Sequence, residues 1–483
     1  MRETARLFAG HTGLGDPSAW EPPAPFSPSL LPAPRLPAPA FCTADPFERA
    51  VRTYGQAYRD LIRAYRGDFA NAPDLVALPR DEDEIVRVLE WAADRGVAVV
   101  PRGGGTSVVG GVEARFDGPS VCLDLGRMNR VLEVDPVSGA ALVEAGATGP
   151  VLNAGLPEGL QLRFFPQSYE LSTLGGWIAT RAGGHFATLH THIDDLVESI
   201  RAITPAGGVW ESRRLPGSGA GPSPDRWLLG SEGALGVITR AWVRVQRRPA
   251  YKASVPVMFA EWRAGVAAVH DLAQSGLYPS NCRLLDAREA ALTSGGDGRH
   301  ALLIVGFESA GHPVGAWVAR ALEITSRHGG VAGEARQDKE WKGAFTRMPY
   351  LRNAYPGLGV IAETFETAVT WDRFPALHEA VMAEADGSAT CRLAFAYPDG
   401  PAPYYTVLVP AVRGAEAEQW DELKRRFSET VLRMGGTITH HHAVGRDHRP
   451  FYDRQRPDAF ALALRAAKDA LDPRGILNPG VLI

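Results

Sequence analysis

A glycine run stands where the chain could most readily bind a phosphate. Residues 101–111 read PRGGGTSVVGG and directly follow the strand-like residues 97–100. Consecutive glycines let backbone N–H groups converge on a pyrophosphate with no Cβ in the way, and Thr106 and Ser107 add hydroxyl donors. The run matches neither GxGxxG, which would need a glycine at Val108, nor a GK[ST] loop, and a lone GGG more often forms a tight turn.

Two more segments rich in glycine and hydroxyl residues lie among apolar strands. They are 168–184, SYELSTLGGWIATRAGG, and 230–238, GSEGALGVI. Three such loops could be simple turns, or they could converge on one elongated cofactor that carries many oxygen atoms. Residue types alone leave both interpretations open.

A histidine triplet, His440–His442, is the second chemical signal. On an extended segment His440 and His442 share one face and His441 points the opposite way, so one metal ion could not easily bind all three. The imidazoles could be exposed structural residues, metal ligands, or groups that move protons or bind phosphate near neutral pH. Residue chemistry alone favours the exposed structural interpretation.

A tyrosine and two arginines complete the candidates. Tyr404 lies in YPDGPAPYYTVLV, Arg352 in PYLRNAY and Arg283 in NCRLLD. Such a tyrosine is ordinarily a core residue whose hydroxyl finds a partner, and an arginine is ordinarily a surface ion-pair residue. A phenol, with an ordinary pKa of about 10, needs cationic or hydrogen-bonding help to act as a base, which the neighbouring histidines could supply. A guanidinium fork suits a phosphate.

The elements that must position these residues begin with a strand and a helix. LVALPR at 75–80 predicts a short strand, and 81–96 predicts a helix with Asp81 as N-cap, Glu84 at the capping-box position and Gly96 at its end. This is a mixed α+β region in which a glycine loop follows a strand. Further strands are expected at 121–125, 131–135 and 141–147.

The second half of the chain, after a break near 247–249, alternates strands with helices. Its apolar runs and helical spacing predict strands at 301–307 and 405–409 and helices at 314–328, 415–434 and 457–471.

The N-terminal residues read differently. Nine prolines between Pro17 and Pro39 predict an extended arm over 1–44. From Asp45 the apolar spacing predicts a helix. Its expected core-facing stripe is Phe47, Val51, Tyr54, Tyr58, Leu61 and Ile62.

Composition excludes several classes of protein. Lys plus Arg number 51 and Asp plus Glu 55, and the net charge of −4 gives no electrostatic reason to expect nucleic acid or an anionic membrane as the main partner. With 45% hydrophobic and 22% charged residues, the chain is an ordinary globular mixture and is not disordered over its whole length. The four cysteines form no CxxC pair, no apolar run approaches the roughly 20 residues of a membrane span, and residues 1–10 lack a signal-peptide core. We therefore expect a soluble, cytoplasmic protein.

Ordered motifs carry a family resemblance. PRGGGTSVVGG, SYELSTLGGWIATRAGG, DDLVESIRAITPAGG and GSEGALGVIT resemble the FAD-binding domain of the vanillyl-alcohol oxidase/para-cresol methylhydroxylase (PCMH) superfamily. Within it the chain is similar to the alkylglycerone-phosphate synthases, a likeness that continues through ATCR, GGTITHHHAVG and DPRGILNPG. The resemblance implies an α+β fold with a two-subdomain PCMH-type FAD-binding domain, an α+β cap domain of antiparallel sheet and helices, and a C-terminal helical segment.

The same resemblance implies roles for individual residues. Tyr404 is the implied general acid/base, His440, His441 and His442 lie next to the flavin, and Arg352 and Arg283 bind substrate. FAD is expected to be non-covalent, because no His or Cys stands at the loop position where other members attach it. The implied FAD-binding residues are Pro101, Arg102, Gly103, Gly104, Gly105, Thr106, Ser107, Gln167, Ser168, Tyr169, Glu170, Leu171, Ser172, Thr173, Thr180, Arg181, Ala182, Gly183, Glu232, Gly233, Ala234, Leu235, Gly236, Val237 and Ile238.

The resemblance implies a reaction of ether lipid synthesis: the acyl group of an acyl-dihydroxyacetone phosphate-like substrate is exchanged for an alkyl ether through an adduct at flavin N5, without net redox. Two alternatives stay open, a FAD-linked oxidase or dehydrogenase of a 2-hydroxy acid or related alcohol, and a flavoprotein of specialised metabolism. Many dehydrogenase relatives carry an HxGDGNxH metal motif where this chain has AYPDGPAPY, which favours the transferase and no metal site. Where the synthases have His followed by Glu-Pro-Asp, this chain has Phe164, Phe165, Pro166 and Gln167.

We expect four parts in the chain: an N-terminal arm and helix at 1–70, the FAD-binding domain at 71–248, a substrate or cap domain at 249–434, and a segment at 435–483 that returns to the FAD domain. The expected partner is a small-molecule or lipid-like substrate and not nucleic acid. A homodimer and peripheral contact with a membrane are further expectations.

Overall fold

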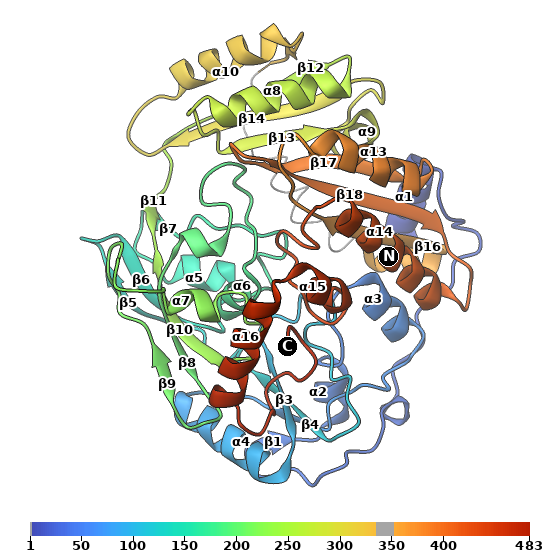
Figure 1. Ribbon diagram of the computed structural model, residues 1–483. Helices are drawn as coiled ribbons and strands as arrows, with labels where there is room; N and C mark the ends of the chain where they lie inside the picture. The colour runs from blue at the N-terminus through green and yellow to red at the C-terminus, as the bar shows by residue number, and fades with distance from the viewer. Residues whose placement is uncertain (1, 335–351) are drawn as a thin grey trace. The chain divides into compact units, whose positions relative to one another are not determined.

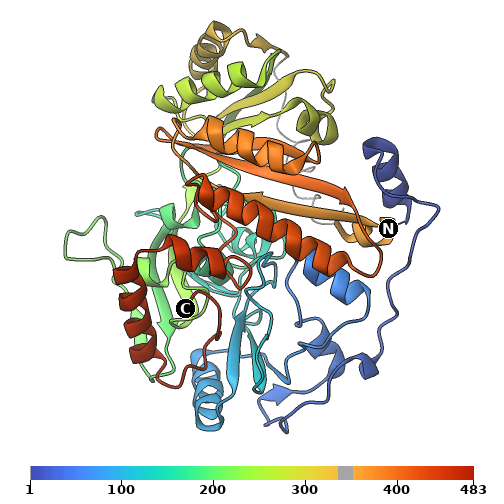
Figure 2. The same ribbon diagram turned by 45° about the vertical axis from the view of Figure 1, so that its right-hand side comes forward.

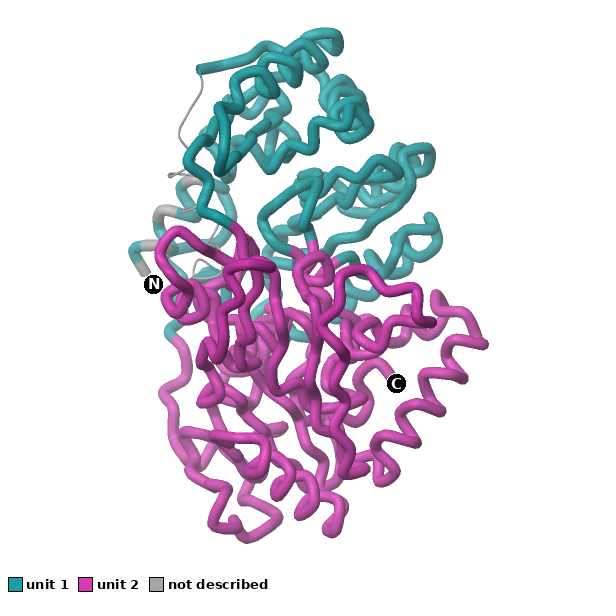
Figure 3. Tube along the Cα trace, turned by 90° about the vertical axis from the view of Figure 1, so that its left-hand side faces the viewer, with its two compact units in different colours: residues 1–22, 184–191, 247–440 teal, residues 23–183, 192–246, 441–483 magenta. Residues whose placement is uncertain are grey.

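The chain passes repeatedly between two units. The computed structural model describes residues 2–334 and 352–483, and Figure 3 draws the units in separate colours. Unit 1 comprises the residues up to Pro22, Gly184–Thr191 and Arg247–His440. Unit 2 comprises Pro23–Gly183, His192–Gln246 and His441–Ile483. Each unit is therefore assembled from three separate stretches of chain.

Unit 2 contains two larger sheets (Figure 1). In the four-stranded sheet, of order β1-β2-β4-β3, the strands β2, β4 and β3 are parallel, whereas the five-stranded sheet β5-β6-β10-β8-β9 is antiparallel. The strands are β1 (Cys42–Thr43), β2 (Leu75–Ala77), β3 (Ala98–Arg102), β4 (Ser120–Asp124), β5 (Val131–Asp135), β6 (Ala140–Glu144), β8 (Val197–Ile203), β9 (Val209–Glu211) and β10 (Val237–Arg244), with β7 (Leu160–Gln161) and β11 (Gln246–Arg247) as a separate pair.

Unit 2 also contains helices and 3-10 turns. The helices are α2 (Pro46–Ala50), α3 (Tyr58–Tyr65), α4 (Glu82–Arg95), α5 (Gly149–Ala154), α6 (Leu174–Thr180), α7 (Asp225–Leu228), α15 (Arg449–Gln455) and α16 (Asp458–Leu471), with 3-10 turns at η1 (Pro28–Leu30) and η2 (Ile193–Asp195). Of these, α4, α6 and α7 contact strands of the two sheets. The capping predicted for α4 is confirmed, because the Asp81 carboxylate accepts from the Glu84 N–H at 2.9 Å and Gly96 ends the helix in the left-handed conformation.

One apolar core serves both sheets of unit 2. It joins side chains of the first sheet, such as Val99 and Leu123, to Val143 and Ile200 of the second, and all four are at most 1% exposed. Leu477 belongs to the same core and forms a parallel bridge with Val99. The C-terminal segment is thus part of the hydrophobic centre of unit 2.

The helix predicted from Asp45 is wrong in its middle. The structure has two short helices, α2 and α3, and the residues between them bend around the glycine loop. Gly55 lies so close to the loop that a Cβ there would stand 2.3 Å from the Ser107 carbonyl oxygen, and the Gln56 N–H donates to that oxygen at 2.6 Å. Tyr54, Tyr58 and Ile62 are buried as expected, but Phe47 is 61% exposed and Val51 48% exposed.

Unit 1 is built on a seven-stranded antiparallel sheet of order β15-β12-β14-β13-β17-β18-β16. Its strands are β12 (Tyr251–Phe259), β13 (Asn281–Leu285), β14 (Ala301–Ser309), β15 (Val331–Ala332), β16 (Val360–Glu366), β17 (Ala389–Ala396) and β18 (Pro401–Pro410). Its helices are α1 (Arg2–Thr12), α8 (Trp262–Gln274), α9 (Ala287–Ser294), α10 (Gly315–Arg327), α12 (Tyr355–Leu358), α13 (Phe374–Ala385) and α14 (Glu416–Arg433), with a 3-10 turn at η3 (Arg352–Ala354).

Four helices cover one face of this sheet. Figure 2 shows α8 and α10 over one end of the sheet and α13 and α14 over the other. Alternate strand residues such as Leu284, Leu393 and Tyr405 join the apolar residues of these helices in a single core. Residues one position away on each strand, such as Arg392 and Tyr404, therefore point to the opposite face of the sheet.

The expected N-terminal arm begins with a helix that the proline count did not reveal. The helix α1 precedes Pro17, and Phe8 packs on Tyr355 with ring centroids 4.6 Å apart. Among the described residues, the structure has no helix that is both long and apolar enough to span a bilayer.

Candidate active site

The predicted cofactor segments come together in unit 2. The glycine loop after β3 packs against residues 171–173: a Cβ on Gly104 would stand 1.9 Å from the Leu171 carbonyl oxygen, and one on Gly103 would stand 2.1 Å from the Thr173 hydroxyl. Glycine is required here because two backbones approach within the space of one methyl group.

The same loop presents a row of backbone donors. Within the part of the chain that the structure describes, the N–H groups of residues 103–107 donate to no protein acceptor, whereas the Ser107 hydroxyl accepts from the Gly111 N–H at 3.0 Å. Convergent N–H groups of this kind form a cradle for an anion. The loop therefore fits the diphosphate of a dinucleotide, the group for which its sequence was singled out.

Two further segments join the loop through backbone contacts. The Gly230 N–H donates to the Ile178 carbonyl at 3.0 Å, and the Glu232 N–H donates to the Ala179 carbonyl at 2.9 Å. Gly233, at φ +74°, lies beside Pro101, where a Cβ would stand 3.1 Å from the proline Cγ. These contacts bring residues 230–233 together with the end of α6 and with Pro101 of the glycine loop.

Not every side chain in these segments can reach a ligand. The guanidinium of Arg102 turns away and donates to the carbonyls of Val51 and Tyr54, at 3.2 and 3.1 Å. Leu235 and Val237 are at most 1% exposed and lie in the core of unit 2. These three residues support the site through the backbone and through packing.

Glu232 is buried and connects its own loop to two later segments of unit 2 by hydrogen bonds. Its carboxylate accepts from the N–H groups of Val444 and Gly445 at 2.9 and 2.7 Å, and its own carbonyl accepts from the Asn478 amide at 2.8 Å. Burial raises the pKa of Glu232 to about 7, although the two backbone donors oppose the shift. Sequence reasoning missed Asn478 and the backbone of 444–445, whose roles depend on contacts more than 200 residues away.

On the face of the unit 1 sheet opposite the four helices, buried polar side chains lie in a row. Tyr404 on β18 is paired directly with Glu366 on β16 and with Arg392 on β17. Paired residues of adjacent strands project to the same face. The guanidinium carbon of Arg392 lies 3.9 Å from the centre of the Tyr404 ring. The cation that the structure places on this phenol is therefore an arginine.

An ion pair with Glu289 on α9 holds the Arg392 side chain in place. Its Nη1 donates to the Glu289 carboxylate at 2.6 Å, and the Thr390 hydroxyl donates to the other oxygen of that carboxylate. The helix α9 can present Glu289 there because Asp286, directly after β13, caps it by accepting from the Glu289 N–H at 2.6 Å. Glu289 and Arg392 were not among the predicted site residues.

Arg283 belongs to the same group. It lies on β13, is 3% exposed, and has a pKa lowered to about 9 by burial and by the like charge of Arg392, which Glu289 only partly offsets. Arg352 starts the turn η3 and is half-buried. Burial raises the pKa of Tyr355 to about 12, opposed by the charge of Arg352 and assisted by that of Glu289.

His440 is held by tyrosine and carboxylate. Its Nε2 lies 2.9 Å from the Tyr397 hydroxyl, which donates to the Thr191 hydroxyl at 3.0 Å. The Glu366 carboxylate accepts from the His440 backbone N–H and, at 2.8 Å, from the Thr439 hydroxyl. Sequence reasoning singled out neither Tyr397 nor Glu366.

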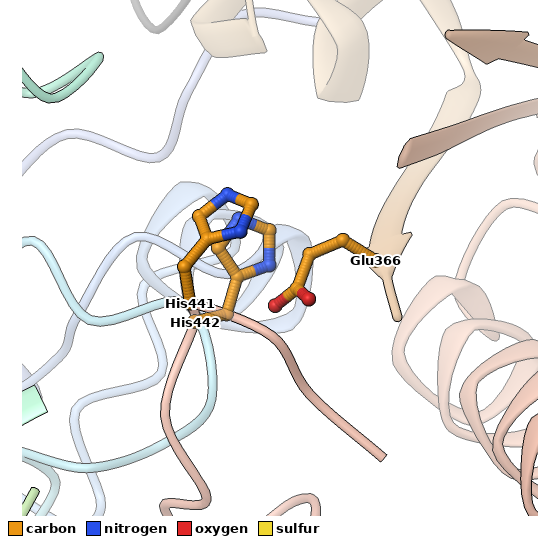
Figure 4. Close-up of side chains that lie close together, drawn as sticks. All are labelled: Glu366, His441 and His442. Atoms are coloured by element: carbon orange, nitrogen blue, oxygen red, sulfur yellow. The ribbon is translucent and has the colours of Figure 1, made fainter. Parts of the chain in front are cut away.

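The other two histidines do not follow the extended geometry on which their expected directions rested. The chain bends at His440–His442, and the rings of His441 and His442 face each other with centroids 4.6 Å apart. Figure 4 shows the two rings side by side on neighbouring residues, with Glu366 labelled at the end of β16. The boundary between the units falls inside the triplet, since His440 is assigned to unit 1 and His441 to unit 2.

Phe164, which stands where the synthases have a histidine, is a core residue. It is fully buried in unit 2 and packs on Trp177 with ring centroids 5.2 Å apart. A histidine at this position would face the indole and the surrounding apolar side chains.

Two family models match this chain. A family model described as "FAD binding domain" matches residues 73–213, and one described as "FAD linked oxidases, C-terminal domain" matches residues 248–482. The alkyldihydroxyacetonephosphate synthase of Trypanosoma brucei brucei is 31% identical in an alignment that covers 91% of this chain and 78% of that protein. That of Dictyostelium discoideum is 29% identical, with the same two coverages.

Solved structures show a likeness to the same kind of synthase. A crystal structure of alkyldihydroxyacetonephosphate synthase matches with a TM-score of 0.81 and 25% identity, and the match covers 99% of this chain and 91% of that one. The predicted α+β class, FAD as the cofactor and an enzymatic role are confirmed.

Proposed function

This chain belongs to the alkyldihydroxyacetonephosphate synthase family of FAD-linked enzymes, and we propose that it replaces the acyl group of an acyl-dihydroxyacetone phosphate by an alkyl ether. The bond between C1 and the acyloxy oxygen breaks, and the fatty acid leaves with that electron pair. The oxygen of a fatty alcohol bonds to C1 and the alcohol gives up its proton. An ester and an alcohol become an ether and an acid, with no net oxidation.

The side chains of unit 1 supply the proton transfer and the anion binding in this proposal. Tyr404 accepts a proton from C1 of the substrate and returns it when the ether has formed. Arg352 and Arg283 bind the substrate phosphate, for which a guanidinium fork is well suited. Bound FAD supplies an electron sink for the carbon at C1, and the backbone donors of residues 103–107 hold its diphosphate.

One observation carries the proposal: the phenol of Tyr404 is buried in a row of charged side chains, between Glu366 and Arg392. Tyr404 packs with the apolar residues Ala394, Phe395 and Ala402 and also lies beside these two charged side chains. Tyr405, on the opposite face, stacks on Phe365 in an apolar core. A phenol that moves a proton needs cationic or hydrogen-bonding help, and Arg392 is a cation in contact with its ring.

An oxidase or dehydrogenase of a 2-hydroxy acid is the second candidate. The description of the matching C-terminal model, FAD linked oxidases, favours it. The hairpin between β17 and β18 speaks against a metal-dependent form, because residues 397–400 are Tyr, Pro, Asp and Gly and close as a tight turn through the Tyr397 N–H and the Gly400 carbonyl, 2.9 Å apart.

The deciding experiment is an anaerobic incubation of the purified protein with acyl-dihydroxyacetone phosphate and a fatty alcohol, without an electron acceptor. Mass spectrometry of the products over time should show many ethers formed per enzyme, with the flavin spectrum oxidised at the end. If FAD-bound protein forms no ether, the proposed reaction is wrong, and flavin reduction by a panel of hydroxy acids tests the second candidate.

The Arg352→Ala variant tests whether the substrate carries a phosphate group that Arg352 binds. We expect a rise in KM for the phosphorylated substrate of about tenfold or more with a smaller change in kcat, because a charged hydrogen bond contributes roughly 1.5–3 kcal/mol. An unchanged KM would remove the phosphate from the substrate or Arg352 from its site.

Non-covalent FAD, a homodimer, a cytoplasmic location and peripheral membrane contact are further proposals. The four cysteines, present as free thiols, support a reducing compartment. Acid precipitation that releases the flavin, light scattering of the holoenzyme, cell fractionation and co-sedimentation with lipid vesicles test the four in turn.

A further inference from the structure

The buried pair Arg392–Glu289 touches Tyr404 and is not used by the reaction as described so far. Glu289, Arg392 and Tyr404 come from α9, β17 and β18, so three separate elements build this contact. The side chains of Glu289 and Arg392 are 3% and 11% exposed. A buried ion pair is a costly arrangement for stability alone.

The geometry of the pair is specific. The Arg392 guanidinium lies over the face of the Tyr404 ring at 3.9 Å, within the range of a cation–π contact. Burial acts to lower the pKa of Arg392, but the Glu289 carboxylate and the Tyr404 ring outweigh it and raise that pKa above its usual value. The guanidinium therefore keeps its charge in this position.

Charge on a phenol that loses its proton spreads into the ring, directly under this cation. Among the described residues, Glu366 on β16 is a direct strand partner of Tyr404, and Arg283 on β13 and Glu289 on α9 interact with Arg392. The Glu366 carboxylate is engaged by the Thr439 hydroxyl and the His440 N–H, and the Glu289 carboxylate by Arg392 and Thr390. Both carboxylates are thus engaged by other groups, and the Arg392 guanidinium lies over the Tyr404 ring.

We propose that Arg392, held in place by Glu289, is a positioning residue that stabilises the deprotonated form of Tyr404. The inference rests on the proposed function, because it assumes that Tyr404 moves the proton. It adds to that function a residue whose charge lies against the phenol, a task that the sequence had assigned to histidines.

The test replaces both charges at once. In Arg392→Met/Glu289→Gln the ion pair is removed as a unit, so that neither partner stays charged without the other, and the ring keeps an apolar neighbour. The matched control is Lys424→Met/Glu363→Gln, which removes a buried ion pair of 2.9 Å on the other face of the same sheet. Both variants must retain FAD absorbance before they are compared.

The first measurement is an ultraviolet difference titration of the holoenzyme, with the Tyr404→Phe holoenzyme subtracted so that only the Tyr404 phenol remains. Without Arg392, the midpoint should move to higher pH by about 1–3 units, the effect of removing an opposite charge in contact. The pH at which turnover rises should move by the same amount. The control variant should show neither shift.

An unshifted Tyr404 titration in folded, FAD-bound Arg392→Met/Glu289→Gln would overturn the inference. If that variant does not fold, Arg392→Gln, which can still donate to Glu289, decides in the same way. A wild-type protein that makes no ether while the titration shifts would overturn the proposed reaction and leave the role of Arg392 standing.

Discussion

The two units prepare for chemistry in opposite ways. In unit 2 the segments predicted to bind FAD meet mainly at glycines and through main-chain hydrogen bonds. In unit 1 the site is a set of ionised and hydroxyl side chains carried by strands and one helix, and it is arranged by strand register. The contacts in unit 2 thus suit a ligand held by the main chain, and those in unit 1 suit a ligand held by side chains.

This difference predicts different sensitivities. A backbone cradle tolerates many side-chain changes but no added Cβ where two chains touch, whereas a side-chain cluster fails when one functional group is removed and its neighbours stay. The following variants should separate the two, from the largest expected effect to the smallest.

Tyr404→Phe should remove the function of unit 1 and leave unit 2 intact. We expect turnover to fall by about 10²–10⁴, the usual contribution of a general acid–base group, with FAD content unchanged. Product mass spectrometry and the flavin absorbance of the purified variant measure the two effects. Near-wild-type turnover would exclude Tyr404 from the reaction.

Asp60→Asn tests whether a buried charge behind the glycine loop helps or harms unit 2. Burial, together with Glu113 and Asp447, raises the pKa of Asp60 to about 7, so the folded protein binds this proton more tightly than the unfolded chain does. Stability is therefore lost as the pH rises from about 4 to about 7. The variant should escape this loss and exceed wild type by on the order of 2–4 kcal/mol at about pH 8, in denaturant titrations, while matching it near pH 4.

Asp68→Asn is the control of opposite sign. Its pKa is held below the usual range by Arg63, which donates to the carboxylate at 2.7 Å, so that carboxylate stabilises the fold at neutral pH. The variant should be less stable than wild type near neutral pH. Equal pH dependence for both variants would contradict the assignment of Asp60.

Gly104→Ala should damage unit 2 and leave the chemistry of unit 1 unchanged. The new Cβ would stand 1.9 Å from the Leu171 carbonyl oxygen, and displacing the loop costs about 1–3 kcal/mol. We expect FAD affinity to fall about 10–100-fold, with normal turnover in FAD-saturated protein. Gly118→Ala is the matched control, because a Cβ there meets nothing within 4 Å.

Tyr397→Phe should have the smallest effect. It removes the hydroxyl 2.9 Å from His440 Nε2 without changing the ring, and one such hydrogen bond contributes about 1 kcal/mol, or roughly fivefold in rate. Steady-state turnover with saturating FAD measures the change. Tyr251→Phe, on an exposed residue of β12, should leave turnover unaltered.

The sequence predicted best what is encoded locally. The helix α4 shows its cap, its apolar spacing and its terminal glycine within 16 residues, and the glycine run after β3 is visible within seven. The same locality explains the success at α10 and α14, each of which was predicted to within a residue or so at either end.

The failures concern partners that are distant in the chain. The row of Glu366, Tyr404 and Arg392 exists because of the registers of β16, β17 and β18, and a shift of one residue would send these side chains to the other face. Phe47 and Val51 were expected in the core because helical spacing was extended across Gly55, where the need to reach Ser107 breaks the helix. Tertiary contact, and not local preference, decided both cases.

The path of the chain between the units has a consequence for biosynthesis. Unit 2 needs Leu477 beside Val99, and the Lys468 ammonium donates to the carbonyls of Ala234 and Leu477, yet the residues Arg247–His440 of unit 1 are synthesised in between. At about 5–20 residues per second, a ribosome needs roughly 10–40 s to add that stretch. During that interval the core of the flavin-binding unit lacks its C-terminal residues. Apolar surface on the growing chain is then accessible to chaperones that bind such surface.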